Sequence, residues 1–256
     1  MQKVILGTIV SLFGFVNPGL AQSVIVPDGT LGNENSALPP ALQSPNLNII
    51  TNGVQRGKNL FHSFSQFNVG EGRSAYFFIP DIVVKNILTR ITGNSRSEIL
   101  GRLGTFQISG NAFAPSDANF FFMNPNGIIF GPSSSLDIGG SVLITTANAF
   151  QFPGGEAFSA SNPALPSQVL TIDPSALLYN AIVAQNSEIV VRSSFNDPNN
   201  LIGTTNGLQV RNGKNLFLVG GDISLDGGQL FAPGGRVELG GLREQGTIGL
   251  TDIAVA

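Results

Sequence analysis

The 256-residue chain contains no cysteine and only one histidine, His62. Without cysteine there is no disulfide and no thiolate metal site, so packing and backbone hydrogen bonds must hold the fold. A Ser-His-Asp triad or a histidine-based metal site would depend on His62 alone, and no Gly-x-Ser-x-Gly segment accompanies it. We therefore expect no enzyme activity, no metal and no cofactor. We expect His62 to be a satisfied or half-exposed histidine of a strand.

Charge is also scarce, since charged residues make up 11% of the chain. The 13 basic and 16 acidic residues give a net charge of −3, which argues against nucleic acid as a partner. Lys85, Arg90, Arg96 and Arg102 are scattered over a polar stretch. They could contact an acidic partner surface, but we expect them to serve ordinary solubility.

No apolar run is long enough to cross a membrane, which takes about 20 residues. The longest run, Val4 to Val16, follows a lysine, and the ending Gly19-Leu20-Ala21 suits signal peptidase. We predict a signal peptide over residues 1–21. The mature chain, from about Gln22, is then expected outside the cytosol.

Glycine, by contrast, is abundant, with 32 residues, and near the C-terminus it recurs in pairs about seven residues apart. Two apolar rows share this spacing. They are Leu216, Ile223, Leu230 and Val237, and two residues further on Leu218, Leu225, Ala232 and Leu239. A seven-residue apolar repeat is typical of a coiled coil, but glycine costs roughly 1 kcal/mol in a helix interior. The alternation between the pairs instead indicates short strands of about five residues.

Such strands could form antiparallel hairpins or a solenoid of stacked parallel coils. The constant spacing and preserved register favour the solenoid, with three faces per coil of about 21 residues. Leu216 should then lie one rung below Val237, and Leu218 below Leu239.

The chain therefore predicts an all-β fold, a single solenoid domain over residues 22–256. We expect a cap in the N-terminal segment, with an exposed loop from Pro27 to Pro45. A loop or an extra-helical flap is expected from Gln151 to Gln185, which contains four prolines. The sequence Gly-Lys-Asn-Leu-Phe occurs at residues 57–61 and 213–217, which suggests a shared coil geometry.

The segment ANFFFMNPNGIIFGPSSSLDIGGSVLITTANAF, with LFHSFSQFNV upstream, resembles the N-terminal secretion domain of filamentous haemagglutinin-type exoproteins. The resemblance covers residues 23–149 and extends more loosely through the glycine-cornered coils of residues 205–241, in a style close to cyanobacterial members. The hallmark of these domains is a secretion motif, with a possible supporting strand upstream. The matching residues are Asn124, Pro125, Asn126, Gly127 and Ile128 for the motif, and Phe64, Phe67 and Val69 for the strand.

This resemblance implies a right-handed parallel β-helix with an N-terminal cap, exported by two-partner secretion through the periplasm to the cell surface. The domain would engage the periplasmic POTRA domains of an outer-membrane transporter and nucleate β-helix folding of an adhesin or haemagglutinin. Many members carry a second box, Asn-Pro-Asn-Leu, between the Phe-rich segment and Asn124, and this chain lacks it there. The similar segment Ser44-Pro45-Asn46-Leu47 lies too early in the chain and has lost the first Asn. Family exoproteins usually continue into a long passenger, so we expect the chain to be a fragment or to lack its effector region.

Two questions stay open at this point. The secretion motif could be a tight turn, a contact for the transporter, or both. The alternative function is a surface glycan-binding or polysaccharide-processing β-helix exported by another route, with host or neighbouring-cell glycans as partners. The outward Phe231 and the low charge leave room for glycan adhesion. Asp222 and Asp226 lie roughly 13 Å apart along one strand, too far for a glycosidase carboxylate pair.

Overall fold

The computed structural model describes residues 22–109, 112–180, 187–194, 207–242 and 244–250. These residues form an almost purely β structure, with two short 3-10 turns, η1 (Gly32–Glu34) and η2 (Pro40–Leu42), and no α-helix in the described ranges. None of the described helices is long and apolar enough to cross a membrane. The mostly-β prediction is confirmed, whereas the predicted signal peptide, residues 1–21, lies outside the described residues.

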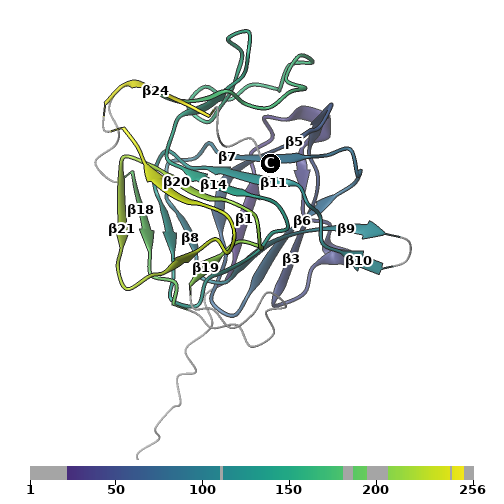
Figure 1. Ribbon diagram of the computed structural model, residues 1–256. Coiled ribbons are helices and arrows are strands. Elements are labelled where there is room, and N and C mark those ends of the chain that lie inside the picture. The colour runs from purple at the N-terminus through teal and green to yellow at the C-terminus, as the bar shows by residue number, and fades with distance from the viewer. Residues whose placement is uncertain (1–21, 110–111, 181–186, 195–206, 243, 251–256) are drawn as a thin grey trace, which may run out of the picture.

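The largest sheet, here called the long sheet, runs through the middle of the molecule (Figure 1). Its strands are parallel except for those at its N-terminal end, where β1 and β4 pair with β5 in antiparallel fashion. The strands are β1 (Val24–Pro27), β4 (Val54–Arg56), β5 (Asn59–Asn68), β7 (Asn86–Ile91), β11 (Asn119–Met123), β14 (Val142–Thr145), β20 (Leu216–Val219) and β23 (Val237–Gly240).

Two further sheets have parallel strands drawn from the segments between those of the long sheet. The second sheet has antiparallel strands only at its edges, β2 and β10. It contains β2 (Ser36–Ala37), β3 (Leu47–Asn52), β6 (Ser74–Ile79), β9 (Arg102–Ser109), β10 (Ala112–Ala114) and β13 (Ser135–Asp137). The third sheet contains β8 (Ser97–Ile99), β12 (Ile128–Phe130), β18 (Glu188–Val191) and β21 (Asp222–Leu225), and a short parallel pair joins β19 (Leu208–Gln209) to β22 (Leu230–Phe231).

The chain visits the three sheets in turn. From β11 in the long sheet it passes to β12 in the third and β13 in the second, and it then returns as β14 beside β11. The predicted register is confirmed, because Leu216 pairs with Val237 and Leu218 with Leu239. The two Gly-Lys-Asn-Leu-Phe copies also share a geometry, since each leads into a strand of the long sheet, β5 or β20.

The paired glycines have two different causes. Gly227 and Gly234 have φ angles of 74° and 64°, in the left-handed region that favours glycine. Gly228 and Gly235 do not, but a Cβ atom on either would overlap the carbonyl oxygen of the coil beneath, that of Val191 or Lys214. In these two pairs the first glycine makes the corner and the second lets successive corners stack.

The last coil differs from the prediction in its burial. Leu225, Val237 and Leu239 belong to the apolar rows expected to face inward, yet they are 47%, 37% and 49% exposed. Their strands, β21 and β23, are the last of their sheets within the described residues, so a neighbouring coil covers them on one side only.

Two apolar cores lie on opposite faces of the long sheet. Side chains such as Phe120 and Phe122 point into the main core enclosed by the three sheets. Phe121 and Met123 alternate with them and pack against a flap, which covers the other face. The flap is an antiparallel sheet of β15 (Ala149–Gln151), β16 (Ala157–Ser159), β17 (Ala176–Tyr179) and β24 (Gly246–Gly249). The predicted flap therefore exists, and it contains strands.

The N-terminal segment closes over the first coil. β1 pairs with β5, and β2 pairs with β3, so both sheets gain an antiparallel neighbour at this end. The prediction of an exposed loop from Pro27 to Pro45 is wrong for its centre, because Leu31 is 0% and Ser36 3% exposed. Leu31 belongs to the core beneath the flap.

Candidate functional site: the secretion motif and its supports

The secretion motif forms a tight turn between β11 and β12. The Gly127 amide donates to the Asn124 carbonyl at 3.1 Å, and the Asn126 amide donates to Asn124 Oδ1 at 2.9 Å. Gly127 has a φ of 106°, which a side chain would strain. The residue types of the motif therefore match the backbone that the turn requires.

Asn124 is 0% exposed and connects neighbouring coils. Its Nδ2 donates to the carbonyl of Ser95 and the hydroxyl of Ser97, each at 3.0 Å, and both belong to the preceding coil. Its backbone amide donates to the carbonyl of Thr145 in the following coil at 3.0 Å. The Asn126 side chain adds a bond to the Gly93 carbonyl at 2.7 Å.

Only part of the motif reaches the surface. Asn124, Gly127 and Ile128 are buried, and Ile128 belongs to the main core. Pro125 and Asn126 are half-buried. Any surface that the motif offers to another protein thus comes from these two side chains.

The possible supporting strand lies entirely inside the molecule. Phe64, Phe67 and Val69 are each 0% exposed. The Phe67 ring lies 5.3 Å from that of Phe122 on β11, and Val69 bridges to Ile99 on β8. These residues pack the first coil against the strands that flank the motif.

His62 is fully buried, so the half-exposed alternative is wrong. Its Nδ1 lies 3.0 Å from the Ser36 hydroxyl, whereas Nε2 has no hydrogen-bond partner within the described part of the chain. Burial lowers the pKa of His62 to about 3, so the ring is neutral at pH 7. No group of three His, Cys, Asp or Glu side chains is placed to hold a metal ion in the described part of the chain.

Arg90 was expected at the surface, and that prediction is wrong because the side chain is 0% exposed. Its guanidinium donates to Ser63 Oγ at 2.8 Å and to Thr30 Oγ1 at 2.7 Å, in β5 and the N-terminal segment. It also donates to the flap carbonyls of Ser159 and Ala164, at 3.0 and 2.9 Å. Arg90 therefore joins the N-terminal segment, the long sheet and the flap.

Asp28 balances this buried cation through shared hydroxyls. Burial by itself raises the pKa of Asp28, but hydrogen bonds from Ser63, Thr92 and Thr30 lower it overall. Burial has the opposite effect on the cation: it lowers the pKa of Arg90 to about 10, and the negative charge of Asp28 opposes this shift. Both groups are ionised at neutral pH.

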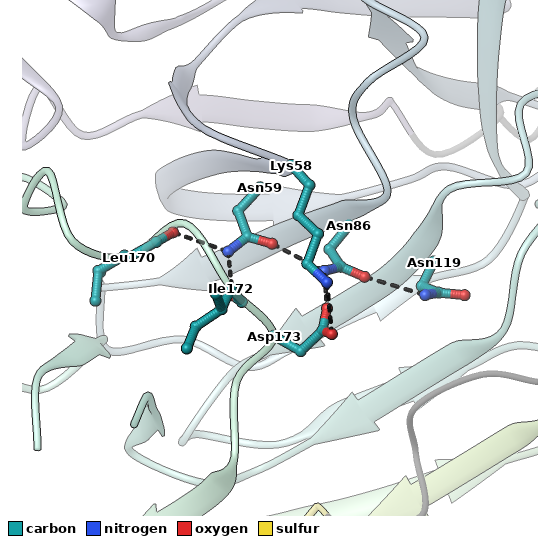
Figure 2. A network of polar contacts seen from close by, with 7 residues as sticks. All are labelled: Lys58, Asn59, Asn86, Asn119, Leu170, Ile172 and Asp173. Atoms are coloured by element: carbon teal, nitrogen blue, oxygen red, sulfur yellow. Dashed lines mark hydrogen bonds and ion pairs between the residues drawn. The ribbon is translucent and has the colours of Figure 1, made fainter. Parts of the chain in front are cut away.

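An asparagine ladder crosses the long sheet at the start of its strands (Figure 2). Asn86 Nδ2 donates to Asn59 Oδ1 at 2.8 Å, and Asn119 Nδ2 donates to Asn86 Oδ1 at 3.0 Å. The row continues through Ser141 and Asn215. The Ser141 backbone amide donates to Asn119 Oδ1, and the Asn215 backbone amide donates to Ser141 Oγ.

The flap is fastened to this ladder by the segment 170–173, here called the strap. Asn59 Nδ2 donates to the carbonyls of Leu170 and Ile172, at 2.8 and 2.6 Å. Asp173 accepts from Asn86 Nδ2 at 2.7 Å and pairs with Lys58 Nζ at 2.6 Å (Figure 2). Sequence reasoning missed these residues. The signal was a polar Asn or Ser that precedes two apolar residues at the start of successive strands.

Of the two outward carboxylates, Asp222 begins β21 and Asp226 follows its last residue. Asp222 and Asp226 are both exposed, and Asp226 pairs with Arg192 at 2.9 Å. Ser44 and Leu47, at the ends of the segment that is similar to the second family box, exchange backbone hydrogen bonds across a tight turn, at 2.9 and 3.2 Å.

The family is decided by a match that spans nearly the whole described fold. The family model described as the TPS secretion domain matches residues 23–255. The chain belongs to this family. No curated protein matches the sequence. As a TPS (two-partner secretion) domain, the chain is the non-enzymatic N-terminal secretion domain of a secreted exoprotein, and its partner is an outer-membrane transporter.

Proposed function

We propose that the three sheets are the faces of a right-handed parallel β-helix, closed at its N-terminal end by a cap. The support is the parallel pairing of successive strands within each sheet and the antiparallel pairing of β1 and β2 at one end. The right hand follows from sterics, because crossovers between parallel strands of one sheet are right-handed in about 98% of cases.

The proposed organisation is a signal peptide over residues 1–21 and a single β-helix domain over residues 22–256. This domain directs export through the outer-membrane transporter by engaging its periplasmic POTRA domains, and it nucleates β-helix folding of an adhesin or haemagglutinin. Each finished coil offers open strand edges on which the next coil pairs. The likeness to cyanobacterial members rests on sequence style alone.

The secretion motif acts, in this proposal, by setting the fold of the coils that are recognised. The observation that carries it is the burial of Asn124 between hydrogen-bond partners in the preceding and following coils. Replacing it would leave the carbonyl of Ser95 and neighbouring groups without a partner, at a cost of about 1–3 kcal/mol each. Pro125 and Asn126 then provide the accessible part of the same turn.

The test is secretion of the full chain by cells that also produce its candidate outer-membrane transporter. We expect Asn124→Ala to reduce both export and the thermal stability of the purified protein. We expect Pro125→Ala to affect export more than stability, because this side chain is half-buried. Asn162→Ala, at an exposed position of the flap, is the matched control.

Three outcomes separate the alternatives. Loss of export in Asn124→Ala with unchanged stability would place the motif in direct transporter recognition. Normal export of an unstable Asn124→Ala would mean that the motif serves the fold alone. Wild-type export that ignores the transporter would contradict the proposed secretion route.

A further inference from the structure

A groove opens on the outer face of the second sheet, and none of its lining residues belongs to the secretion motif. It encloses about 310 Å³, within the size range of small-ligand sites. Its lining combines side chains from β3, β6, β9, β10 and β13 with one from the loop that follows β19. The edge strand β10 pairs only with β9, and the two form a hairpin that projects from the body of the molecule (Figure 1).

One wall of the groove is aromatic. The Tyr76 and Phe106 rings meet edge to face at 6.3 Å, and Phe106 and Phe113 do so at 5.2 Å. Phe113 is 75% exposed, whereas Leu47 and Ile49 on the opposite side are partly covered. An exposed phenylalanine at the mouth of a groove offers a flat apolar surface to a ligand.

The other end of the groove is polar. Tyr76 donates its hydroxyl to Asp137 Oδ2 at 2.8 Å, and Arg211 reaches Asp137 Oδ1 at 3.4 Å. Burial and the neighbouring Asp137 charge raise the pKa of Tyr76 to about 12, which keeps this hydroxyl protonated. The Arg211 side chain is 29% exposed, although its Nε is buried and has no hydrogen-bond partner among the described residues.

The chemistry of the two ends restricts the ligand. Asp137 and Arg211 are the two charged side chains of the lining and form an ion pair, so each offsets the attraction of the other for a charged ligand. A purely apolar ligand would cover the Asp137 carboxylate, whose side chain is 42% exposed, without giving it a donor, which is costly. The ligand that fits is neutral, with one flat apolar face and a hydroxyl-bearing edge.

We propose that this groove binds a neutral pyranose, with its C–H face on Phe106 and Phe113 and its hydroxyls on Asp137 and Arg211. A single sugar ring in a small, open groove would bind weakly. Repeated sugar units or several copies of the chain on a surface would strengthen the interaction. The groove is separate from the secretion motif, so this inference does not depend on the transporter.

The test is saturation-transfer difference NMR on the full secreted chain with methyl β-D-glucopyranoside and methyl β-D-galactopyranoside as probes. We expect millimolar binding of at least one of the two. Phe113→Ala and Asp137→Asn should each weaken it about tenfold, the effect of one lost contact of this kind. Ile82→Ala, at a 73% exposed position in another loop, is the matched control and should bind normally.

Circular dichroism of each variant checks the fold, and Asp137→Asn keeps an acceptor for Tyr76, so at least one variant should stay native. No saturation transfer from either glycoside would overturn the proposal. Binding as strong as that of the wild type in both Phe113→Ala and Asp137→Asn would show that the sugars bind elsewhere. Stronger binding of glucuronate or glucosamine would contradict the charge balance, and equal binding of benzyl alcohol would contradict the role of the polar end.

Discussion

At the residue scale, the space left for a Cβ atom controls the corners between strands. A Cβ on Gly139, between β13 and β14, would overlap the carbonyl oxygen of Ser116, which is fixed backbone. A Cβ on Gly240 would meet nothing within 4 Å. We expect Gly139→Ala to lower the free energy of unfolding by about 3 kcal/mol. Gly240→Ala should change it by less than about 0.5 kcal/mol.

Urea unfolding followed by circular dichroism measures both values on the same scale. Equal stabilities of the two glycine variants would mean that the corner at Gly139 relaxes without cost. The stacked-corner explanation of the glycine pairs would then be wrong.

The buried histidine makes a second prediction at this scale. The pKa of His62 is about 3 in the folded protein and about 6.5 in an unfolded chain, so the unfolded state binds more protons between these values. The free energy of unfolding is therefore unaffected by His62 above about pH 6.5, where the ring is neutral in both states. It decreases as the pH falls toward 3, because the unfolded chain takes up a proton on His62 that the folded protein does not. We expect the free energy of unfolding to be about 2 kcal/mol smaller at pH 5 than at pH 7.

His62→Gln provides the comparison, because glutamine can still meet the Ser36 hydroxyl but does not titrate. Its free energy of unfolding should change much less between pH 7 and pH 5 than that of the wild type. An identical decrease in both proteins would assign the pH dependence to other groups. Because the pKa of Asp28 is lowered below its usual value of 3.8, the stability that its charge contributes is lost only at more acidic pH.

At the scale of elements, the asparagine ladder determines how the flap is attached. Asn86→Leu removes the acceptor of Asn119 Nδ2 and the donor to Asp173, in a region with little access to water. We expect a loss of about 2–4 kcal/mol in stability. Amide hydrogen exchange of the strap, residues 170–173, should accelerate in the same variant. Asn162→Leu, at an exposed flap position, is the control and should change neither property.

Unchanged exchange of the strap in Asn86→Leu would mean that contacts outside the ladder hold the flap. Arg90→Met should then release it, because Arg90 donates to the carbonyls of Ser159 and Ala164.

The elements differ in how well the sequence predicts them. The apolar runs of β11 and β12 indicate strands, and the glycine-spaced repeat also predicts the register of β20 against β23. The strands of the flap, such as β17, have no such period, and four nearby prolines hide them. Arg90 could not be placed from its residue type, because the flap that buries it comes from more than 60 residues further along the chain.

At the scale of the whole molecule, the repeat fixes the stacking of coils, but burial depends on how many neighbours each coil has. Leu216 and Val237 occupy equivalent positions, and they are 0% and 37% exposed. The same holds for the candidate site. The motif was visible as a turn in the sequence, whereas the burial of Asn124 depends on coils both before and after it.

This dependence on neighbours predicts a gradient of stability along the long sheet. Strands β7 and β11 have a paired strand on each side, the main core on one face and the flap on the other. β23 has a described neighbour on one side only, and all of its residues are exposed. Because amides that open locally exchange without global unfolding, we expect those of β23 to exchange at least about 100-fold faster than those of β11. β20 should lie between the two. Hydrogen exchange with mass spectrometry of the native protein measures this order. Uniform protection of β11, β20 and β23 would mean that the coils open as one cooperative unit. The gradient would then be wrong, because it requires the last coil to open without the others.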